Sequence, residues 1–264
     1  MTRIDRKFAQ LKAEKRQAFI PYITAGDPSR DITRDLILAL EKAGADIIEL
    51  GVPFSDPIAD GPVIQRATER ALSQHMTLSK VLQLAKEIRL QSEIPLVLFS
   101  YYNPIFRYGL KNLARDAADC GFDGVLATDL TVEESGEYRE AMSAAGLNTI
   151  FLAAPTSSPE RLKKIAQTSN GFLYAVSRTG VTGETQELSQ ELRGFVEELR
   201  RYTESPIAVG FGISQPEHVT AVWKEADAAI VGSALVREIE KNIGHADLVE
   251  RVAAFAKWLR GEAA

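Results

Sequence analysis

Short runs of apolar, often β-branched residues alternate along the chain with longer stretches in which apolar residues recur every three to four positions. The longer stretches predict amphipathic helices, for example over residues 32–43, 81–90, 159–168 and 188–202. Nearly continuous apolar strands that alternate with helices are typical of a parallel sheet covered by helices. The short runs predict eight strands, at residues 18–23, 46–51, 95–101, 124–129, 149–154, 172–177, 207–211 and 228–232.

Eight strand–helix units in 264 residues match the size of a (β/α)8 TIM barrel. The competing interpretation is a doubly wound open sheet, which usually carries a glycine-rich fingerprint after its first strand. Residues 24–28 follow the first strand here and read Thr-Ala-Gly-Asp-Pro, which is no such fingerprint. We therefore predict one α/β TIM-barrel domain over residues 1–264. An extra N-terminal helix with Ile4, Phe8 and Leu11 on one face could cover the barrel floor.

Composition narrows the classes of function. A formal net charge of −5 argues against nucleic-acid binding as the main task, which needs a basic face. No apolar run of 18 residues is present, so we expect no membrane-spanning segment. Cys120 is the single cysteine, which excludes an internal disulfide and suits a reducing cytoplasm. We expect Cys120 itself to be a small packed residue and not a reactive thiol.

A carboxylate interrupts the second predicted strand close to its C-terminal end. Side chains alternate between the two faces of a strand, so Glu49 shares a face with Ile47, while Ile48 and Leu50 share the other. The face of Ile48 and Leu50 must meet the surrounding helices, so we expect Glu49 to point into the barrel mouth. Burial raises a carboxyl pKa and favours proton transfer near neutral pH. The alternative is a glutamate paired with a structural arginine or lysine.

The loop after this strand adds a second candidate acid, Asp60, with Asp56 between the two. Either aspartate could simply belong to a solvated turn, and this alternative is stronger for Asp56. Two carboxyls at different depths can have different pKa values, so that one serves as the acid–base catalyst and the other as a fixed anionic acceptor.

Glycine-rich segments follow the last three predicted strands, at residues 180–183, 210–214 and 232–234. Phosphate groups in barrels commonly bind at the loops after strands seven and eight and at a helix N-terminus. Glycine allows close approach of the backbone, and the Ser233 hydroxyl can donate. Three such segments at successive strand ends indicate a phosphorylated small molecule as the substrate.

Missing features also restrict the chemistry. The three histidines lie away from the predicted strand ends, so no metal-ligand cluster is visible, and the sixth strand has no lysine for a Schiff base. We therefore expect acid–base catalysis by carboxyl groups, without a metal, on a phosphorylated substrate. An indole-glycerol-phosphate synthase or a sugar-phosphate epimerase is the nearest enzyme alternative, but each would need a catalytic lysine or metal ligands. An inactive regulatory homologue is the alternative outside the enzymes.

These residues closely resemble the family of tryptophan synthase α subunits. The signature spans residues 49–62, from Glu49 to Pro62, and is highly specific. Further matches lie at residues 21–28, 101–104, 154–156, 177–183, 210–213 and 232–234, so the resemblance covers about residues 3 to 260. It implies reversible retro-aldol cleavage of indole-3-glycerol phosphate to indole and glyceraldehyde 3-phosphate, with no cofactor in this subunit.

The resemblance also implies roles for individual residues. Glu49 would protonate indole C3 and help to remove the glycerol hydroxyl proton, and Asp60 would accept the indole N–H. Thr182 would help to close the site and orient Asp60. The implied substrate-binding set is Tyr22, Ile64, Tyr101, Leu126, Tyr174, Thr182, Gly183, Phe211, Gly212, Gly232 and Ser233.

A partner is implied as well, a pyridoxal-phosphate β subunit that receives indole in an αββα tetramer. The implied interface residues are Pro53, Asp56, Tyr102, Asn103 and Asp129. Two positions depart from the family pattern: Thr131 replaces the usual proline, and Tyr22 occupies a position often held by phenylalanine. Replacing proline by Thr131 could loosen the partner-facing loop, and Tyr22 places an extra hydroxyl near the indole pocket.

Overall fold

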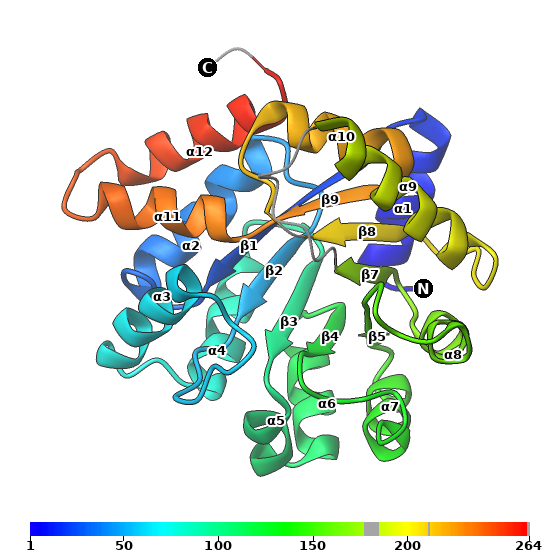
Figure 1. The fold of residues 1–264 in the computed structure, drawn as a ribbon. Coiled ribbons are helices and arrows are strands. Elements are labelled where there is room, and N and C mark those ends of the chain that lie inside the picture. The colour runs from blue at the N-terminus through cyan, green and yellow to red at the C-terminus, as the bar shows by residue number, and fades with distance from the viewer. Residues whose placement is uncertain (177–184, 211, 263–264) are drawn as a thin grey trace.

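The computed structural model describes residues 1–176, 185–210 and 212–262, with only the backbone described for residues 185–189. Parallel strands form the centre of the fold and helices surround them (Figure 1). The strands are β1 Ala18–Thr24, β2 Ile48–Gly51, β3 Leu96–Ser100, β4 Gly124–Ala127, β5 Asn148–Ile150, β6 Leu152–Ala153, β7 Leu173–Val176, β8 Ile207–Gly210 and β9 Ala228–Val231. The helices are α1 Arg3–Glu14, α2 Arg30–Lys42, α3 Pro62–Ser73, α4 Leu78–Ile88, α5 Tyr102–Tyr108, α6 Leu110–Asp119, α7 Gly136–Ala144, α8 Pro159–Thr168, α9 Thr185–Arg200, α10 Pro216–Glu225, α11 Ser233–Asn242 and α12 Leu248–Leu259.

Nine strand segments make the eight predicted positions of the barrel, because the fifth predicted strand is divided at Phe151. Its first part, β5, pairs with β4, and its second part, β6, pairs with β7. The Phe151 N–H donates to the Ser169 hydroxyl at 3.1 Å, outside the strand ladder. The Phe151 carbonyl accepts the Tyr174 N–H at 3.2 Å. The strand order β5-β4-β3-β2-β1-β9-β8-β7-β6 therefore begins and ends on the same strand position, which confirms the predicted TIM barrel.

Alternation along each strand produces two separate hydrophobic cores. Ile48 and Leu50 of β2 lie in the outer core between the sheet and the helices. Ile47 lies in the inner core with Ile20 and Val97, inside the barrel. The predicted assignment of strand faces is therefore confirmed for the second strand, and this assignment directs position 49 inward.

Helix α1 closes the amino-terminal end of the barrel, as predicted. Its buried residues Ile4, Phe8 and Leu11 belong to the inner core, and the Phe8 and Phe172 rings lie 5.9 Å apart. A capping box between Thr2 and Asp5 fixes the start of the helix. Since this end is filled with side chains, a ligand can enter only from the carboxyl ends of the strands. None of the described helices combines the length and apolarity needed to cross a membrane.

Candidate active site

Glu49 lies at the carboxyl end of β2 and points toward the barrel mouth. Its backbone is held between Tyr22 of β1 and Val97 of β3 by the strand register. The side chain is 0% exposed, and neither carboxylate oxygen has a hydrogen-bond partner in the described structure. No arginine or lysine among the described residues pairs with it, so the alternative of a structural ion pair is not supported.

Burial without a partner determines the protonation state of this carboxyl group. Desolvation penalises the charged form and raises the pKa of Glu49 to about 8. The neutral acid therefore predominates at pH 7 in the free protein. A buried carboxylic acid that still carries its proton at neutral pH is suited to general acid catalysis.

Asp60 lies in the loop between β2 and α3 and is only partly buried. Desolvation raises its pKa, and a hydrogen bond from Tyr101 opposes that shift. The Tyr101 hydroxyl also accepts the Ala59 N–H at 2.9 Å, and the Gln65 amide donates to the Asp60 carbonyl at 2.9 Å. These contacts hold the loop backbone at Ala59 and at Asp60 itself. The two acids thus have different depths and partners, which allows different roles.

Aromatic side chains form an apolar wall beside Glu49. Tyr22 and Phe99 make an edge-to-face contact with their centroids 5.0 Å apart. A Cβ atom at Gly51 would lie 2.2 Å from the Tyr22 hydroxyl oxygen, and one at Gly210 would lie 2.3 Å from that of Tyr174. Glycine at these two strand ends therefore leaves space for the tyrosine rings. The wall has the shape and polarity for a flat aromatic group.

The opposite side of the mouth offers backbone N–H groups to an anion. Helix α11 begins at Ser233 after Gly232, and no side chain caps its N-terminus. The first N–H groups of a helix have no partner inside the helix and carry partial positive charge. Gly212, with a φ of +61°, lies in the neighbouring loop after β8. The uncapped helix end and this loop lie in two of the three segments predicted to bind phosphate, residues 232–234 and 210–214, and the third segment, 180–183, lies outside the described residues.

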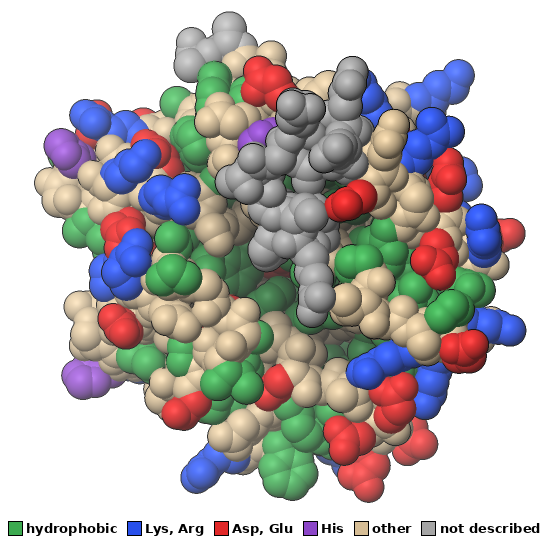
Figure 2. Space-filling model, in the orientation of Figure 1, with side chains coloured by type: hydrophobic (Ala, Val, Ile, Leu, Met, Phe, Trp, Pro, Cys, Tyr) green, Lys and Arg blue, Asp and Glu red, His purple; other side chains and the backbone are tan. Residues whose placement is uncertain are grey.

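One cavity of about 540 Å³ joins these groups at the mouth of the barrel. The face shown in Figure 2 is hollowed near its centre, where hydrophobic side chains gather, and charged groups of both signs lie around it. This volume is in the range of sites for small molecules. Its lining includes the predicted residues Tyr22, Glu49, Asp60, Ile64, Tyr174, Gly212, Gly232 and Ser233.

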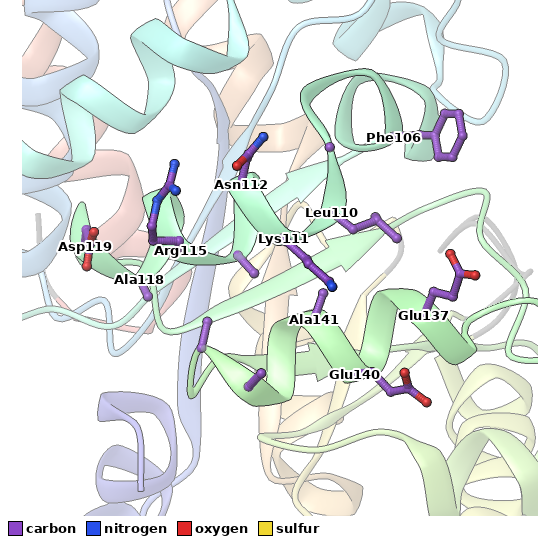
Figure 3. A pocket seen from close by; sticks show the side chains of 14 residues that line it. Phe106, Leu110, Lys111, Asn112, Arg115, Ala118, Asp119, Glu137, Glu140 and Ala141 are labelled. Atoms are coloured by element: carbon purple, nitrogen blue, oxygen red, sulfur yellow. The ribbon is translucent and has the colours of Figure 1, made fainter.

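A second hollow, of about 1040 Å³, lies on the outer surface between α6 and α7 (Figure 3). Small side chains such as Ala114 and Ala141 form its base. Its charged residues, including Lys111 and Glu140, are exposed to solvent. Without a buried acid or base, this hollow offers no chemistry comparable with the barrel mouth.

The other predicted substrate-binding residues have different positions. Leu126 is fully buried in the inner core and does not line the cavity. Tyr101 does not line the cavity, but its hydroxyl accepts the Ala59 N–H and so supports the Asp60 loop. Thr182, Gly183 and Phe211 lie outside the described residues.

Sequence reasoning missed two lining residues that carry charged or aromatic groups, Phe99 and Arg237, whereas Ser214 lies in the predicted segment 210–214. Phe99 shares the inward face of β3 with Val97, so the alternation that located Glu49 could have found it. Arg237 enters the lining through α11, and no strand pattern indicates it. Within the described residues, no group of three His, Cys, Asp or Glu side chains is arranged to hold a metal ion.

The predicted interface residues divide by exposure. Asp56, Asn103 and Asp129 are exposed, and Tyr102 is partly exposed. Pro53 is buried within the chain, so its side chain is not available on that surface. The Asp129 carboxylate accepts the Tyr102 N–H at 2.6 Å, which joins two of these residues at the start of α5.

Comparisons with known proteins agree over almost the whole chain. The family profile described as tryptophan synthase alpha chain matches residues 8–263. The tryptophan synthase alpha chain of Solibacter usitatus is 54% identical over 260 residues, which cover 98% of this chain and 97% of that protein. A tryptophan synthase alpha subunit structure from Legionella pneumophila has a TM-score of 0.91 at 38% identity, covering 98% of each chain.

A chain from a structure of the tryptophan synthase α2β2 complex of Pyrococcus furiosus also has this fold. Its TM-score is 0.86 at 41% identity, covering 92% of this chain and 98% of that one. The profile match over residues 8–263 spans every segment that forms the barrel mouth. The chain therefore belongs to the family of tryptophan synthase alpha chains.

Proposed function

We propose that this chain cleaves indole-3-glycerol phosphate reversibly to indole and glyceraldehyde 3-phosphate, with Glu49 as the acid–base catalyst. The observation that carries the proposal is the buried, unpartnered Glu49 carboxyl with a pKa of about 8, in a cavity with an aromatic wall and an anion-binding end. The aromatic wall would receive the indole ring, and the N-terminus of α11 would receive the phosphate.

The chemistry requires two proton transfers that one carboxyl group can perform in turn. Breaking the C–C bond requires indole C3 to become tetrahedral, and neutral Glu49 supplies that proton. As the bond breaks, its electron pair restores the aromatic ring. The glycerol hydroxyl loses its proton to the Glu49 carboxylate and becomes the aldehyde, which regenerates the acid. Asp60 accepts a hydrogen bond from the indole N–H and stabilises positive charge that develops on the ring nitrogen.

This sequence of steps uses only side chains of the chain itself, and pyridoxal phosphate is expected only in the β partner. We propose that indole passes to that partner in an αββα tetramer. Two exposed hydrophobic side chains support a partner surface at the predicted segments: Ile58 in the loop after β2 is 86% exposed, and Phe106 on α5 is 62% exposed. The single cysteine suits a reducing cytoplasm as the location.

Indole release from indole-3-glycerol phosphate, measured with and without a β subunit, tests the function. We expect Glu49→Gln to reduce kcat by at least about 100-fold, the lower range for general acid–base catalysis. Asp60→Asn should also reduce kcat strongly. Glu140→Gln, which removes an exposed carboxylate from the outer hollow, is the matched control and should retain the wild-type rate.

Two outcomes would contradict different parts of the proposal. No indole release by the wild-type chain in either setting would exclude the function. Activity that survives in both Glu49→Gln and Asp60→Asn would exclude the residue assignment. For the partner surface, Ile58→Asp with Phe106→Asp should reduce stimulation by the β subunit while the rate of the isolated chain is unchanged.

A further inference from the structure

Among the residues that the structure describes, Arg237 is the only cationic side chain that lines the cavity at the barrel mouth. The other ionisable residues of the lining are Glu49, whose buried carboxyl is neutral at pH 7, and Asp60. A phosphate ester that carries two negative charges loses hydrating water on entering this cavity, and a cation on the cavity wall would compensate that charge. The location of Arg237 therefore matters for the choice of substrate.

Helix α11 places this guanidinium at the phosphate end of the cavity. Arg237 follows Ser233 by four positions, so the two side chains share one face of the helix. Ser233, Ala234 and Arg237 all line the cavity, and the uncapped N-terminus of α11 opens into it as well. An anion bound at the first turn of α11 would therefore lie in the same part of the cavity as the Arg237 side chain.

The acidic residues of α11 are engaged elsewhere. Glu240 accepts hydrogen bonds from Arg66 and Arg70, and Glu238 pairs with Lys241. No ion pair joins Arg237 to a carboxylate among the side chains that the structure describes. Its exposed guanidinium keeps its donors for a ligand, and a planar guanidinium can bind phosphate oxygens in pairs.

We propose that Arg237 is a specificity-determining residue that selects a phosphorylated substrate by binding its phosphate dianion, together with the N-terminus of α11. This inference rests on the proposed function for the identity of the substrate. It adds a charged side chain to a phosphate site otherwise built from backbone N–H groups and a serine hydroxyl. Arg237 takes no part in the proton transfers at Glu49.

Steady-state kinetics with three variants tests the assignment. Arg237→Gln should raise KM for indole-3-glycerol phosphate by about 3- to 10-fold, as expected for a solvent-accessible charge pair, with kcat within about twofold of the wild type. Arg237→Lys keeps the charge, so the logarithm of its KM should rise by less than half as much as the logarithm of KM rises in Arg237→Gln. Lys241→Gln removes an exposed cation from the same helix outside the cavity and should leave both constants unchanged.

Ligand binding without turnover separates this proposal from the proposed function. Titration calorimetry with glycerol 3-phosphate should show the same loss of affinity in Arg237→Gln, and the loss should shrink at high salt. The affinity for indole, which has no phosphate, should not change. If the wild type cleaves no substrate, the proposed function fails, while the calorimetric comparison still tests Arg237. Equal affinity for glycerol 3-phosphate in wild type and Arg237→Gln, or an equal loss of indole affinity, would overturn the assignment.

Discussion

Burial of the Glu49 side chain favours its neutral form, and this burial lowers the stability of the fold at higher pH. An unfolded chain exposes the carboxyl group to water, where its pKa returns to an ordinary value near 4.5. The folded chain raises that pKa to about 8, so the folded state binds the proton more tightly. Stability therefore decreases as the pH rises from about 4.5 to about 8, because the folded state must either keep a proton or bury a charge.

Glu49→Gln removes this titration and yields the first prediction. Relative to the wild type, the variant should gain stability as the pH rises. The difference in unfolding free energy between variant and wild type should grow by about 4 kcal/mol from pH 4.5 to pH 8.5. Any fixed cost of burying the amide is the same at both pH values and cancels in this comparison. Urea unfolding at the two pH values measures the difference. A pH-independent difference would mean that Glu49 has an ordinary pKa in the folded state.

The same ionisation predicts the pH dependence of the reaction. If neutral Glu49 supplies the proton to indole C3, kcat/KM should be steady below pH 8 and then decrease by about tenfold per pH unit above it. The expected midpoint near pH 8 belongs to the free enzyme. Initial rates from pH 6.5 to 9.5 provide the measurement. A rate that rises through pH 8 would instead assign the carboxylate form to the first step.

At the scale of elements, one ion-pair network connects the two ends of the active site. Arg70 of α3 donates to both carboxylate oxygens of Asp27, in the loop after β1, at 2.7 and 2.9 Å. It also donates to Glu240 of α11 at 2.7 Å. Hydrogen bonds from Arg66 and from Arg70 lower the pKa of Glu240 to about 2. Helix α3 follows the Asp60 loop directly and α11 begins at the phosphate end, so this network fixes their relative position.

Breaking the network at its centre should destabilise the protein. Asp27 is only 1% exposed, so Arg70→Met leaves a buried carboxyl group without its partner. We expect the unfolding free energy to decrease by about 3 kcal/mol. Adding Asp27→Asn to Arg70→Met should restore part of that loss, because the unpaired acid is removed. Equilibrium unfolding of both single variants and the double variant measures the coupling, and strictly additive effects would contradict it.

For the whole molecule, barrel closure and the N-terminal helix leave one open end. Apolar strand residues and helix α1 fill the barrel interior from its amino-terminal end. Arg3 of α1 and Arg89 both pair with the buried Asp123, which ties α1 to the first residues of the barrel strands. The amino-terminal end of the barrel is therefore closed by packed side chains, and the candidate active site lies at the other end.

Substitution of Phe8 tests this division. Phe8→Ala leaves a cavity beside Phe172 and should decrease the unfolding free energy by about 3 to 4 kcal/mol. KM for indole-3-glycerol phosphate should stay within about twofold of wild type, because the variant changes the closed end of the barrel. Lys12→Ala, at an exposed position of the same helix, should leave stability nearly unchanged. A large rise in KM for Phe8→Ala would show that the two ends are coupled.

The sequence by itself determined the features that depend on neighbouring residues. Short apolar runs located the eight strand positions, and the alternation of side chains along the second strand directed Glu49 inward, since strand faces follow a period of two. The apolar stripe of Ile4, Phe8 and Leu11 predicted α1. The same reasoning could have found Phe99, which shares the inward face of its strand with Val97.

Only the tertiary structure decided the features that depend on residues far apart in the chain. The division of the fifth strand at Phe151 follows from pairing with different neighbours on each side. The raised pKa of Glu49 follows from desolvation, because segments from several parts of the chain bury its carboxyl group, and no local pattern reveals this. Arg237 joins the cavity because α11 packs beside strands from the opposite end of the sequence. Burial and electrostatic fields are sums over the folded chain, so they exist only once the barrel has closed.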